Sequence, residues 1–304
     1  MQVSTILKES EVRRMKKIKL KAMAKINLGL DVVRKREDGY HEVRMIMQTI
    51  QMYDQIQLEV TDTPGIQVQT NLYYLPVNED NLVYKAAKLL MDEFQIEEGL
   101  SIDLKKFIPV AAGMAGGSSD AAAVMVGVNR LFRLGLSTEE LMKRGVKIGA
   151  DVPYCILRGT ALAEGIGEKL TVLPPAPECF VLIAKPGIHV STKFVYTNLK
   201  ANELAYHPDI DGQVEAIKNG DLKKMAALTG NVLETVTIPA YPVIEEIKNV
   251  MKGQGALTSC MSGSGPTVFG LLDDKEKAQK AYDILYQGEL AKQVYLTTFF
   301  NNPK

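Results

Sequence analysis

Residues 109–120 have the sequence Pro109-Val110-Ala111-Ala112-Gly113-Met114-Ala115-Gly116-Gly117-Ser118-Ser119-Asp120. The alternating segment before it, from Ser101 to Phe107, predicts a strand, and an apolar helix is predicted from Ala121 to Phe132. This arrangement suits phosphate binding, because glycine lets the backbone approach an anion and the first helical N–H groups have no internal partner. An ordinary loop with a Ser or Asp N-cap has the same residues, so the loop alone leaves both interpretations open.

The loop does not match the common nucleotide-binding motifs. No Gly-Lys-Ser or Gly-Lys-Thr follows the glycines, which excludes a Walker A motif, and Gly-x-Gly-x-x-Gly is also absent. The protein-kinase signatures His-Arg-Asp and Asp-Phe-Gly do not occur in the sequence. The hydroxyls of Ser118 and Ser119 could cap the helix or contact a phosphate or its metal.

A strand is predicted from Ile18 to Leu30, because apolar residues recur there at every second position. The alternation predicts one buried face and one mostly polar face. Lys25 and Asn27 lie on the polar face and therefore project from the same side of the strand. A solvated lysine is the ordinary interpretation of Lys25, and a shared cleft is the functional one.

Tyr40 and His41 directly follow an Asp38-Gly39 turn. The pair could stack on a flat ring and hydrogen-bond it, or it could anchor the loop. Asp151 lies in an apolar setting, which would raise the basicity of a carboxylate as a general base requires, although a helix or turn cap is the alternative. A second flexible Gly-Ser turn, Met261 to Thr267, could cover phosphates or form a plain hairpin loop.

Taken in order, these segments resemble the GHMP kinase superfamily, named for galacto-, homoserine, mevalonate and phosphomevalonate kinases. The resembling segments are Ala24 to Leu28, Asp38 to His41, Pro109 to Ala121, Gly149 to Pro153 and Met261 to Phe269. Asp-Gly-Tyr-His and Gly-Ala-Asp-Val-Pro are similar to the branch that phosphorylates the 2-hydroxyl of a cytidine-linked erythritol in non-mevalonate isoprenoid precursor synthesis. The Gly-Ser loop is shared across the superfamily.

The resemblance implies a role for each candidate residue on the substrate side. Lys25 and Asp151 would be the catalytic pair, with Asp151 taking the proton of the substrate hydroxyl and Lys25 holding Asp151 ionised. The substrate-binding residues would be Asn27, Tyr40, His41 and Tyr196, the last three of them against the cytidine.

On the ATP side, the resemblance implies that the 109–119 loop cradles the phosphates. The residues concerned are Pro109, Val110, Ala111, Ala112, Gly113, Met114, Ala115, Gly116, Gly117, Ser118 and Ser119. Asn81 and Lys85 would border the adenine, and Ser262, Gly263, Ser264 and Gly265 would form the third motif near the phosphates. ATP would be the co-substrate and Mg²⁺ is expected, but the sequence assigns it no ligands. Alanines replace several family glycines, and since alanine disfavours positive φ, the loop backbone is not predicted.

Length and composition are consistent with a two-domain enzyme. The chain has 304 residues and is 46% hydrophobic, and its 36 Lys and Arg balance 36 Asp and Glu, so no global basic field favours nucleic acid or an anionic membrane. No apolar run approaches the roughly 18 residues of a membrane helix. Three cysteines without Cys-x-x-Cys fit a reducing cytoplasm and exclude a disulfide framework.

The expected fold is α+β, because strands and helices interleave without regular βαβ spacing. Residues 1–16 are predicted to be a loose extension. The Pro174-Pro175-Ala176-Pro177 segment would link two domains, which the resemblance identifies as an N-terminal α/β nucleotide-binding GHMP kinase domain over 17–173 and a ferredoxin-like C-terminal domain over 178–304. We expect a monomer or homodimer acting on a small molecule.

Alternative functions remain at this point. Another small-alcohol kinase, such as one acting on homoserine, would not need an aromatic base clamp like Tyr40-His41. An ATP-using decarboxylase of the same superfamily is a second alternative. A non-catalytic metabolite-binding regulator is a third, and the intact Lys25 and Asp151 argue against it.

Overall fold

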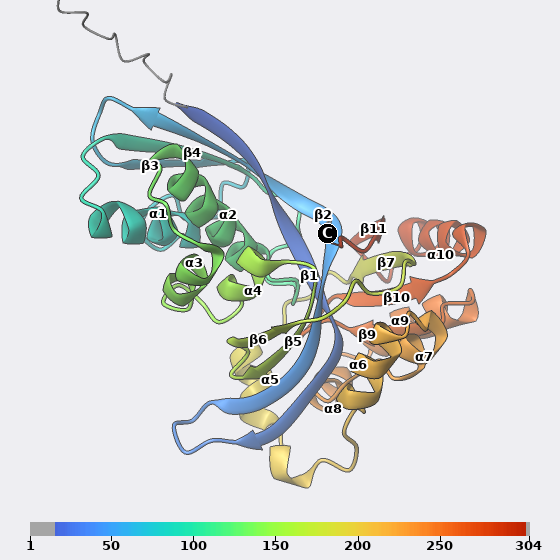
Figure 1. The fold of residues 1–304 in the computed structure, drawn as a ribbon. Coiled ribbons are helices and arrows are strands. Elements are labelled where there is room, and N and C mark those ends of the chain that lie inside the picture. Colours follow the sequence, from blue (N-terminus) through green and yellow to red (C-terminus); the bar gives the residue numbers. More distant parts are fainter. Residues whose placement is uncertain (1–15, 302–304) are drawn as a thin grey trace, which may run out of the picture.

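The computed structural model describes residues 16–301, so the predicted extension lies almost entirely outside the described residues. The larger sheet is built on a long antiparallel hairpin of β1 and β2 that runs through the middle of the molecule (Figure 1). One end of β2 pairs with β4 and the other end with β5, while β8 pairs in parallel with β1. The strands are β1 (Lys17–Lys35), β2 (His41–Thr61), β3 (Ile66–Thr70), β4 (Gly99–Lys105), β5 (Thr160–Gly165), β6 (Lys169–Val172) and β8 (Gly230–Asn231).

The first strand differs from its prediction on one face. Ile26 and Leu28 are buried as expected, against Val181 and Phe269 of the second sheet. The opposite face, which carries Lys25 and Asn27, was expected to be mostly polar, but between residues 22 and 32 it is buried as well. Loops that are distant in the sequence cover this face, so the alternation within the strand could not predict its burial.

Four helices pack on one side of the hairpin (Figure 1). They are α1 (Leu82–Glu93), α2 (Gly116–Leu131), α3 (Thr138–Gly145) and α4 (Val152–Leu157). Helix α2 begins at Gly116 instead of the predicted Ala121, so Ser118 and Ser119 belong to its first turn. The prediction was wrong because glycine and serine are weak helix formers in isolation, whereas here the buried face of α2 contacts β1, β2 and α1.

The second sheet has the strand order β11-β7-β10-β9, with every neighbouring pair antiparallel. Its strands are β7 (Phe180–Lys185), β9 (Thr258–Met261), β10 (Val268–Leu272) and β11 (Gln293–Thr298). In chain order this is 4-1-3-2 with helices between the first and second and the third and fourth strands, which is the ferredoxin-like arrangement. The helices of this half are α5 (Thr192–Asn198), η1 (Ala201–Glu203), α6 (Ile210–Lys218), α7 (Leu222–Ala227), α8 (Glu234–Ala240), α9 (Val243–Gly253) and α10 (Lys275–Gln287).

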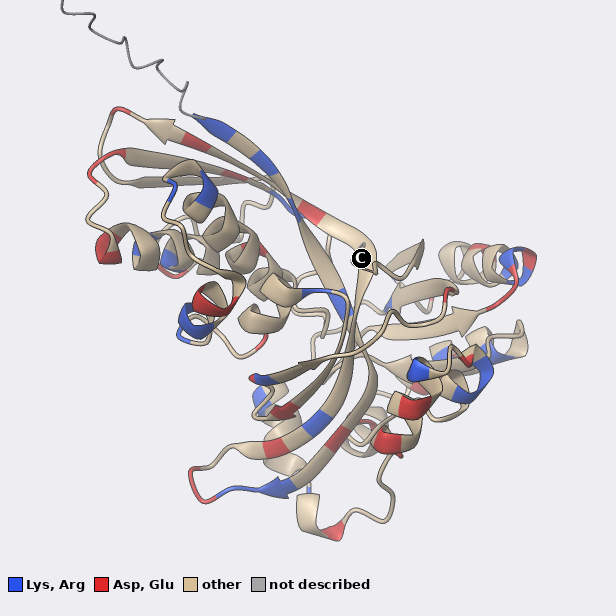
Figure 2. Ribbon diagram, viewed as in Figure 1, with Lys and Arg blue, Asp and Glu red and all other residues tan. Residues whose placement is uncertain are grey.

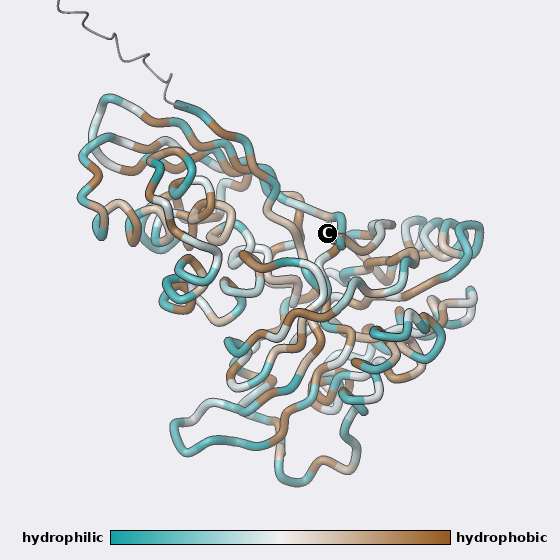
Figure 3. Tube along the Cα trace, in the orientation of Figure 1, coloured by the Kyte–Doolittle hydropathy of each residue, from teal (hydrophilic) through white to brown (hydrophobic). Residues whose placement is uncertain are grey.

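The two halves share more than a linker. Residues 173–179 have no helix or strand, as the prolines predict, but β8 comes after them and still joins the larger sheet. Hydrophobic segments lie along the middle of the hairpin, where the halves meet (Figure 3). Positively and negatively charged residues are interspersed along the ribbon of both halves (Figure 2). The proposed boundaries at 173 and 178 therefore stay a prediction, and no helix among residues 16–301 is long and apolar enough to cross a membrane.

Candidate active site

A cleft of about 1020 Å³ lies between the two halves. It brings together residues that are more than 200 positions apart, from Lys25 on β1 to Ser264 after β9. The predicted site residues that line it are Lys25, Asn27, Tyr40, His41, Asn81, Pro109, Val110, Ala111, Ala112, Gly113, Ala115, Gly116, Gly117, Ser118, Asp151, Tyr196, Gly263 and Ser264.

Five predicted residues do not line the cleft. Lys85 is exposed on α1, and the Met114 side chain is buried in the core. The Ser119 hydroxyl donates to the carbonyl of Met23 at 2.6 Å, so it fastens α2 to β1. The remaining two, Ser262 and Gly265, are the buried residues on either side of Gly263 and Ser264 in the third motif.

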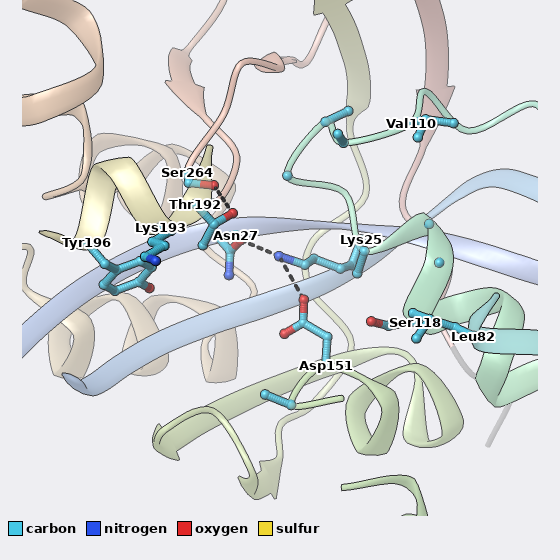
Figure 4. A pocket seen from close by; sticks show the side chains of 18 of the residues that line it. Lys25, Asn27, Leu82, Val110, Ser118, Asp151, Thr192, Lys193, Tyr196 and Ser264 are labelled. Atoms are coloured by element: carbon cyan, nitrogen blue, oxygen red, sulfur yellow. Dashed lines mark hydrogen bonds and ion pairs between the residues drawn. The ribbon is translucent and has the colours of Figure 1, made fainter. Parts of the chain in front are cut away.

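Lys25 and Asp151 meet at the centre of the cleft (Figure 4). The Lys25 ammonium donates to Asn27 Oδ1 at 2.7 Å and lies 3.8 Å from Asp151 Oδ2. The Lys25 side chain is 6% exposed and that of Asp151 is 32% exposed, so the carboxylate faces the cleft. The two positions are 126 residues apart in the chain, and their meeting makes the solvated-lysine interpretation wrong for Lys25.

The Asp151 side chain does not cap the helix that begins beside it. Asp151 stands at the N-terminal end of α4, yet its side chain makes no capping hydrogen bond to that helix. The helix is held in place elsewhere: the Tyr154 hydroxyl contacts Thr49 Oγ1 at 2.9 Å and donates to the carbonyl of Gly159 at 2.7 Å. The helix-cap alternative for Asp151 is therefore not what the structure contains.

The 109–119 loop places the start of α2 at the other end of the cleft. Gly116, Gly117 and Ser118 line it, and their N–H groups belong to the first turn, where they have no partner within the helix. Ala111 and Ala115 have φ of 50° and 54°, so alanine occupies left-handed positions that glycine would adopt without strain. The loop is held to β1, because Lys25 N–H donates to the carbonyl of Met114 at 3.2 Å.

The third motif closes against this loop. The Ser262 hydroxyl donates to the carbonyl of Gly113 at 2.9 Å, and a Cβ at Gly113 would lie 2.1 Å from the Ser262 carbonyl oxygen. Only glycine allows this approach. On its other side the motif contacts α5, where the hydroxyls of Ser264 and Thr192 are 2.8 Å apart (Figure 4).

Aromatic side chains line the far end of the cleft. The rings of His41 and Tyr196 are 5.1 Å apart, and Tyr40 stands beside them on the β1–β2 turn, 61% exposed. His41 Nε2 is buried and has no hydrogen-bond partner within the described part of the chain. Burial, with a contribution from Lys35, lowers the pKa of His41, so the neutral ring has one donor and one acceptor to offer. Burial also raises the pKa of Tyr196 to about 12.

Comparisons with known proteins identify the family of this chain. Family models described as "GHMP kinases N terminal domain" and "GHMP kinases C terminal" match residues 81–159 and 213–290. A protein of Lachnoclostridium phytofermentans named 4-diphosphocytidyl-2-C-methyl-D-erythritol kinase is 59% identical, over 94% of this chain and 98% of its own length. This chain belongs to the GHMP kinase family.

Two solved structures have folds similar to that of this chain. A crystal structure of 4-(cytidine 5'-diphospho)-2C-methyl-D-erythritol kinase is 30% identical with a TM-score of 0.81, covering 94% of this chain and 100% of that one. A homoserine kinase from Cytophaga hutchinsonii has a TM-score of 0.73 at 20% identity, covering 97% of this chain and 96% of that one. The second likeness extends to the fold alone.

Sequence patterns missed one charged cluster of this GHMP kinase. Lys106, just after β4, lines the cleft and forms ion pairs with Asp54 and, at 2.6 Å, with Asp120. Asp54 also accepts from the N–H groups of Phe107 and Ile108, at 2.5 and 2.8 Å. Asp54 lies in the middle of β2, and only its apolar surroundings hint at a buried role. Thr192 and Lys193 of α5 also line the cleft and carry no recognisable motif.

Proposed function

We propose that this chain transfers the γ-phosphoryl group of ATP to the 2-hydroxyl of 4-diphosphocytidyl-2-C-methyl-D-erythritol. The observation that carries the proposal is the position of the Lys25–Asp151 pair, between an aromatic end and a helix N-terminus within one cleft. The aromatic end suits a cytosine ring, and the helix N-terminus suits phosphates. A high-identity relative bears the name of this kinase.

The aromatic end is the part that favours a cytidine substrate over a small alcohol. His41 and Tyr196 present ring faces, and the unpartnered His41 Nε2 offers a hydrogen bond to a base. Homoserine has no ring to fill this space. Tyr40 lies on the exposed side of the same end and would stack on the base from the solvent side.

The reaction follows from the central pair. Asp151 accepts the proton of the substrate hydroxyl while the hydroxyl oxygen attacks the γ-phosphorus of ATP. The bond between the γ-phosphorus and the oxygen that bridges it to the β-phosphorus breaks, and ADP is released. The Lys25 ammonium lies 3.8 Å from the Asp151 carboxylate, close enough to attract its negative charge and to donate a hydrogen bond to the nucleophile. Asn27 accepts from Lys25 and fixes its direction. The N–H groups at the start of α2 neutralise developing phosphate charge without moving.

Oxygen donors in the cleft fit Mg²⁺ carried by ATP. Hard oxygen donors suit this ion, and the Ser118 hydroxyl and the Asp151 carboxylate both line the cleft. Among residues 16–301 no three His, Cys, Asp or Glu side chains gather as a metal site, so phosphate oxygens and water would supply most ligands and Ser118 one more. The bound ion would neutralise phosphate charge. The cytoplasmic location and the monomeric or dimeric state stay predictions.

An ADP-release assay with mass spectrometry of the product tests this function. The cytidyl substrate, homoserine and mevalonate are offered separately with ATP and Mg²⁺. We expect one phosphate to be added to the cytidyl substrate alone. Turnover of a small alcohol instead would overturn the assignment of the aromatic end while keeping the phosphate end.

Replacing Tyr40 by Ala tests the aromatic end directly. Because Tyr40 would contact the base and not the reacting atoms, we expect the KM for the cytidyl substrate to rise about tenfold while kcat changes little. Initial-rate kinetics with each substrate varied in turn measures both. A change confined to the KM for ATP would mean that the two ends of the cleft are assigned in reverse. Tyr74→Ala, at an exposed tyrosine that does not line the cleft, is the control.

A further inference from the structure

The third motif occupies the junction of the three parts of the site. Gly263 and Ser264 line the cleft, Ser262 contacts the 109–119 loop, and Ser264 contacts α5. Pro266 is the residue of the turn with a fixed φ, whereas the glycines at 263 and 265 have φ of 57° and 86° and contribute no side chain to hold the turn. Side chains outside the turn therefore help to fix its position.

Asn231 of β8 supplies that support. Its Nδ2 group donates one hydrogen bond to the carbonyl of Met261 and another to the carbonyl of Gly263, both at 2.8 Å. Its Oδ1 accepts from the N–H of Leu233 at 2.9 Å, so both donors and the acceptor are used. The side chain is buried, with 5% of the residue exposed. The amide thus holds both ends of the segment that leads into the turn.

A second residue on the same short segment holds the remaining polar group of Met261. Glu234 Oε1 accepts from the Met261 N–H at 2.7 Å, and its Oε2 accepts from Lys248 Nζ at 2.6 Å. The backbone N–H and the carbonyl of Met261 are therefore fixed by side chains three positions apart in the chain. This leaves the start of the third motif little freedom to shift along the sheet.

The backbone of Asn231 ties the same support to the substrate strand. Asn231 pairs in parallel with Leu30 of β1, and the N–H of the next residue, Val232, donates to the carbonyl of Leu30 at 3.0 Å. Strand β1 carries Lys25 and Asn27 a few residues earlier. One residue therefore connects the strand that holds the catalytic lysine to the loop that faces the phosphates.

We propose that Asn231 is a positioning residue for phosphoryl transfer, setting the third motif in register with Lys25 and Asp151. The proposal rests on the function proposed above. Asn231 itself does not line the cleft and acts through Gly263 and Ser264. This role needs a single rigid group that directs two N–H donors at two carbonyls. An aspartate has the same shape but, when ionised, has no hydrogen-bond donor.

Asn231→Asp is the test, and Gln213→Glu is the matched control. Gln213 is also a buried amide attached to β1: its Nε2 donates to the carbonyls of Leu28 and Met225, each at 3.1 Å. It has no contact with the third motif and does not line the cleft. Both variants replace a buried amide by a carboxylate facing carbonyl oxygens, so both lower stability, and only the first disturbs the motif.

We expect kcat of Asn231→Asp to fall by about tenfold to a hundredfold, because small misplacements of reacting groups cost that much. The KM for each substrate should change by less than about threefold, which separates positioning from lost binding. Gln213→Glu should keep kcat within about twofold of the parent enzyme at a temperature where thermal melts show both variants folded. If Asn231→Asp does not fold, Asn231→Ser, which keeps one donor, should give an intermediate loss of kcat.

Hydrogen exchange gives a readout that does not depend on activity. In the parent chain the N–H groups of Ser262 and Gly265 are bonded within the turn, to the carbonyls of Thr267 and Ser262. These amides should exchange faster in Asn231→Asp and unchanged in Gln213→Glu. A folded Asn231→Asp with the parent kcat and the parent exchange rates would overturn the proposal, and so would an equal loss of kcat in both variants. A parent enzyme that phosphorylates none of the alcohols would instead refute the proposed function. The exchange measurement would still test whether Asn231 holds the third motif in place.

Discussion

Two of the lysines that line the cleft, Lys25 and Lys106, are buried, and their carboxylate partners are arranged in opposite ways. Lys25 lies 3.8 Å from Asp151, whose side chain is 32% exposed. Lys106 is held between Asp54 and Asp120, with both carboxylate side chains at most 4% exposed. The lysines are equally buried, so the difference lies entirely in the acids.

This difference separates reactive groups from supporting ones. The Asp54 carboxylate accepts from Lys106 and from two backbone N–H groups just before the 109–119 loop, and it is fully buried, so a substrate cannot reach it. The Asp151 carboxylate makes no capping bond to α4 and faces the open cleft. A carboxylate that must accept a proton has to keep a lone pair available, and the arrangement around Asp151 provides one.

Asp151→Asn should have the largest effect on activity and little effect on stability. Removing the proton acceptor should lower kcat about a hundredfold or more, as loss of a general base does. The pair is long and partly exposed, so its loss should change the free energy of unfolding by less than about 1 kcal/mol. Steady-state kinetics and urea unfolding measure the two quantities.

The control for this variant is Asp92→Asn, which breaks a surface ion pair with Lys88 far from the cleft. We expect parent-like kcat from it. If Asp151→Asn kept the parent kcat, Asp151 would not be the general base, and the contrast between the two lysines would have no catalytic meaning.

Asp54→Asn should show the reverse pattern. It leaves the buried Lys106 with one carboxylate instead of two and turns an amide toward the ammonium, and removing one partner of a buried ion pair typically costs about 3–5 kcal/mol. The free energy of unfolding, from urea titration, should fall by that amount. At a temperature where the variant is folded, kcat should drop far less than in Asp151→Asn. A loss of stability below about 1 kcal/mol would mean that the cluster does not support the loop.

Sequence analysis could predict those parts of the site that depend on a local sequence pattern. Lys25 and Asn27 share a strand face, and the 109–119 loop precedes an apolar helix, so both could be inferred from spacing. The ferredoxin-like order of the second sheet and the GHMP kinase fold followed from the resemblance of ordered segments. The shared strand face and the loop–helix arrangement depend on residues close together in the chain, whereas the sheet order came from the resemblance alone.

The features that sequence analysis missed depend on distant packing. The second face of β1 is buried because loops at 114 and 263 cover it, and neither is visible in the strand's own alternation. The left-handed conformations of Ala111 and Ala115 are imposed by the loop's attachment at both ends, against their intrinsic preference. Asp54 and Asp120 acquire their roles only when β2 and α2 meet at Lys106.

The smallest expected effect lies within the tight cluster, between its two acids. Both Asp54 oxygens accept from a donor, whereas Asp120 Oδ1 is buried without a partner among residues 16–301. Burial, reinforced by the nearby Asp54 carboxylate, raises the pKa of Asp120 despite the attraction of Lys106. The folded chain therefore holds this proton at a pH where the unfolded chain, with a pKa of about 3.9, has lost it.

This asymmetry predicts how stability depends on pH. A folded-state pKa above the unfolded value gives stability that is fully present below about pH 3.9 and is lost as the pH rises through the raised pKa. Asp120→Asn, which mimics the protonated acid, should remove this part of the slope and lower stability at pH 4 by less than about 1 kcal/mol. Urea unfolding of the parent and the variant from pH 4 to pH 8 measures it. Parallel pH profiles would show that protonation of Asp120 makes no contribution to the pH dependence of stability.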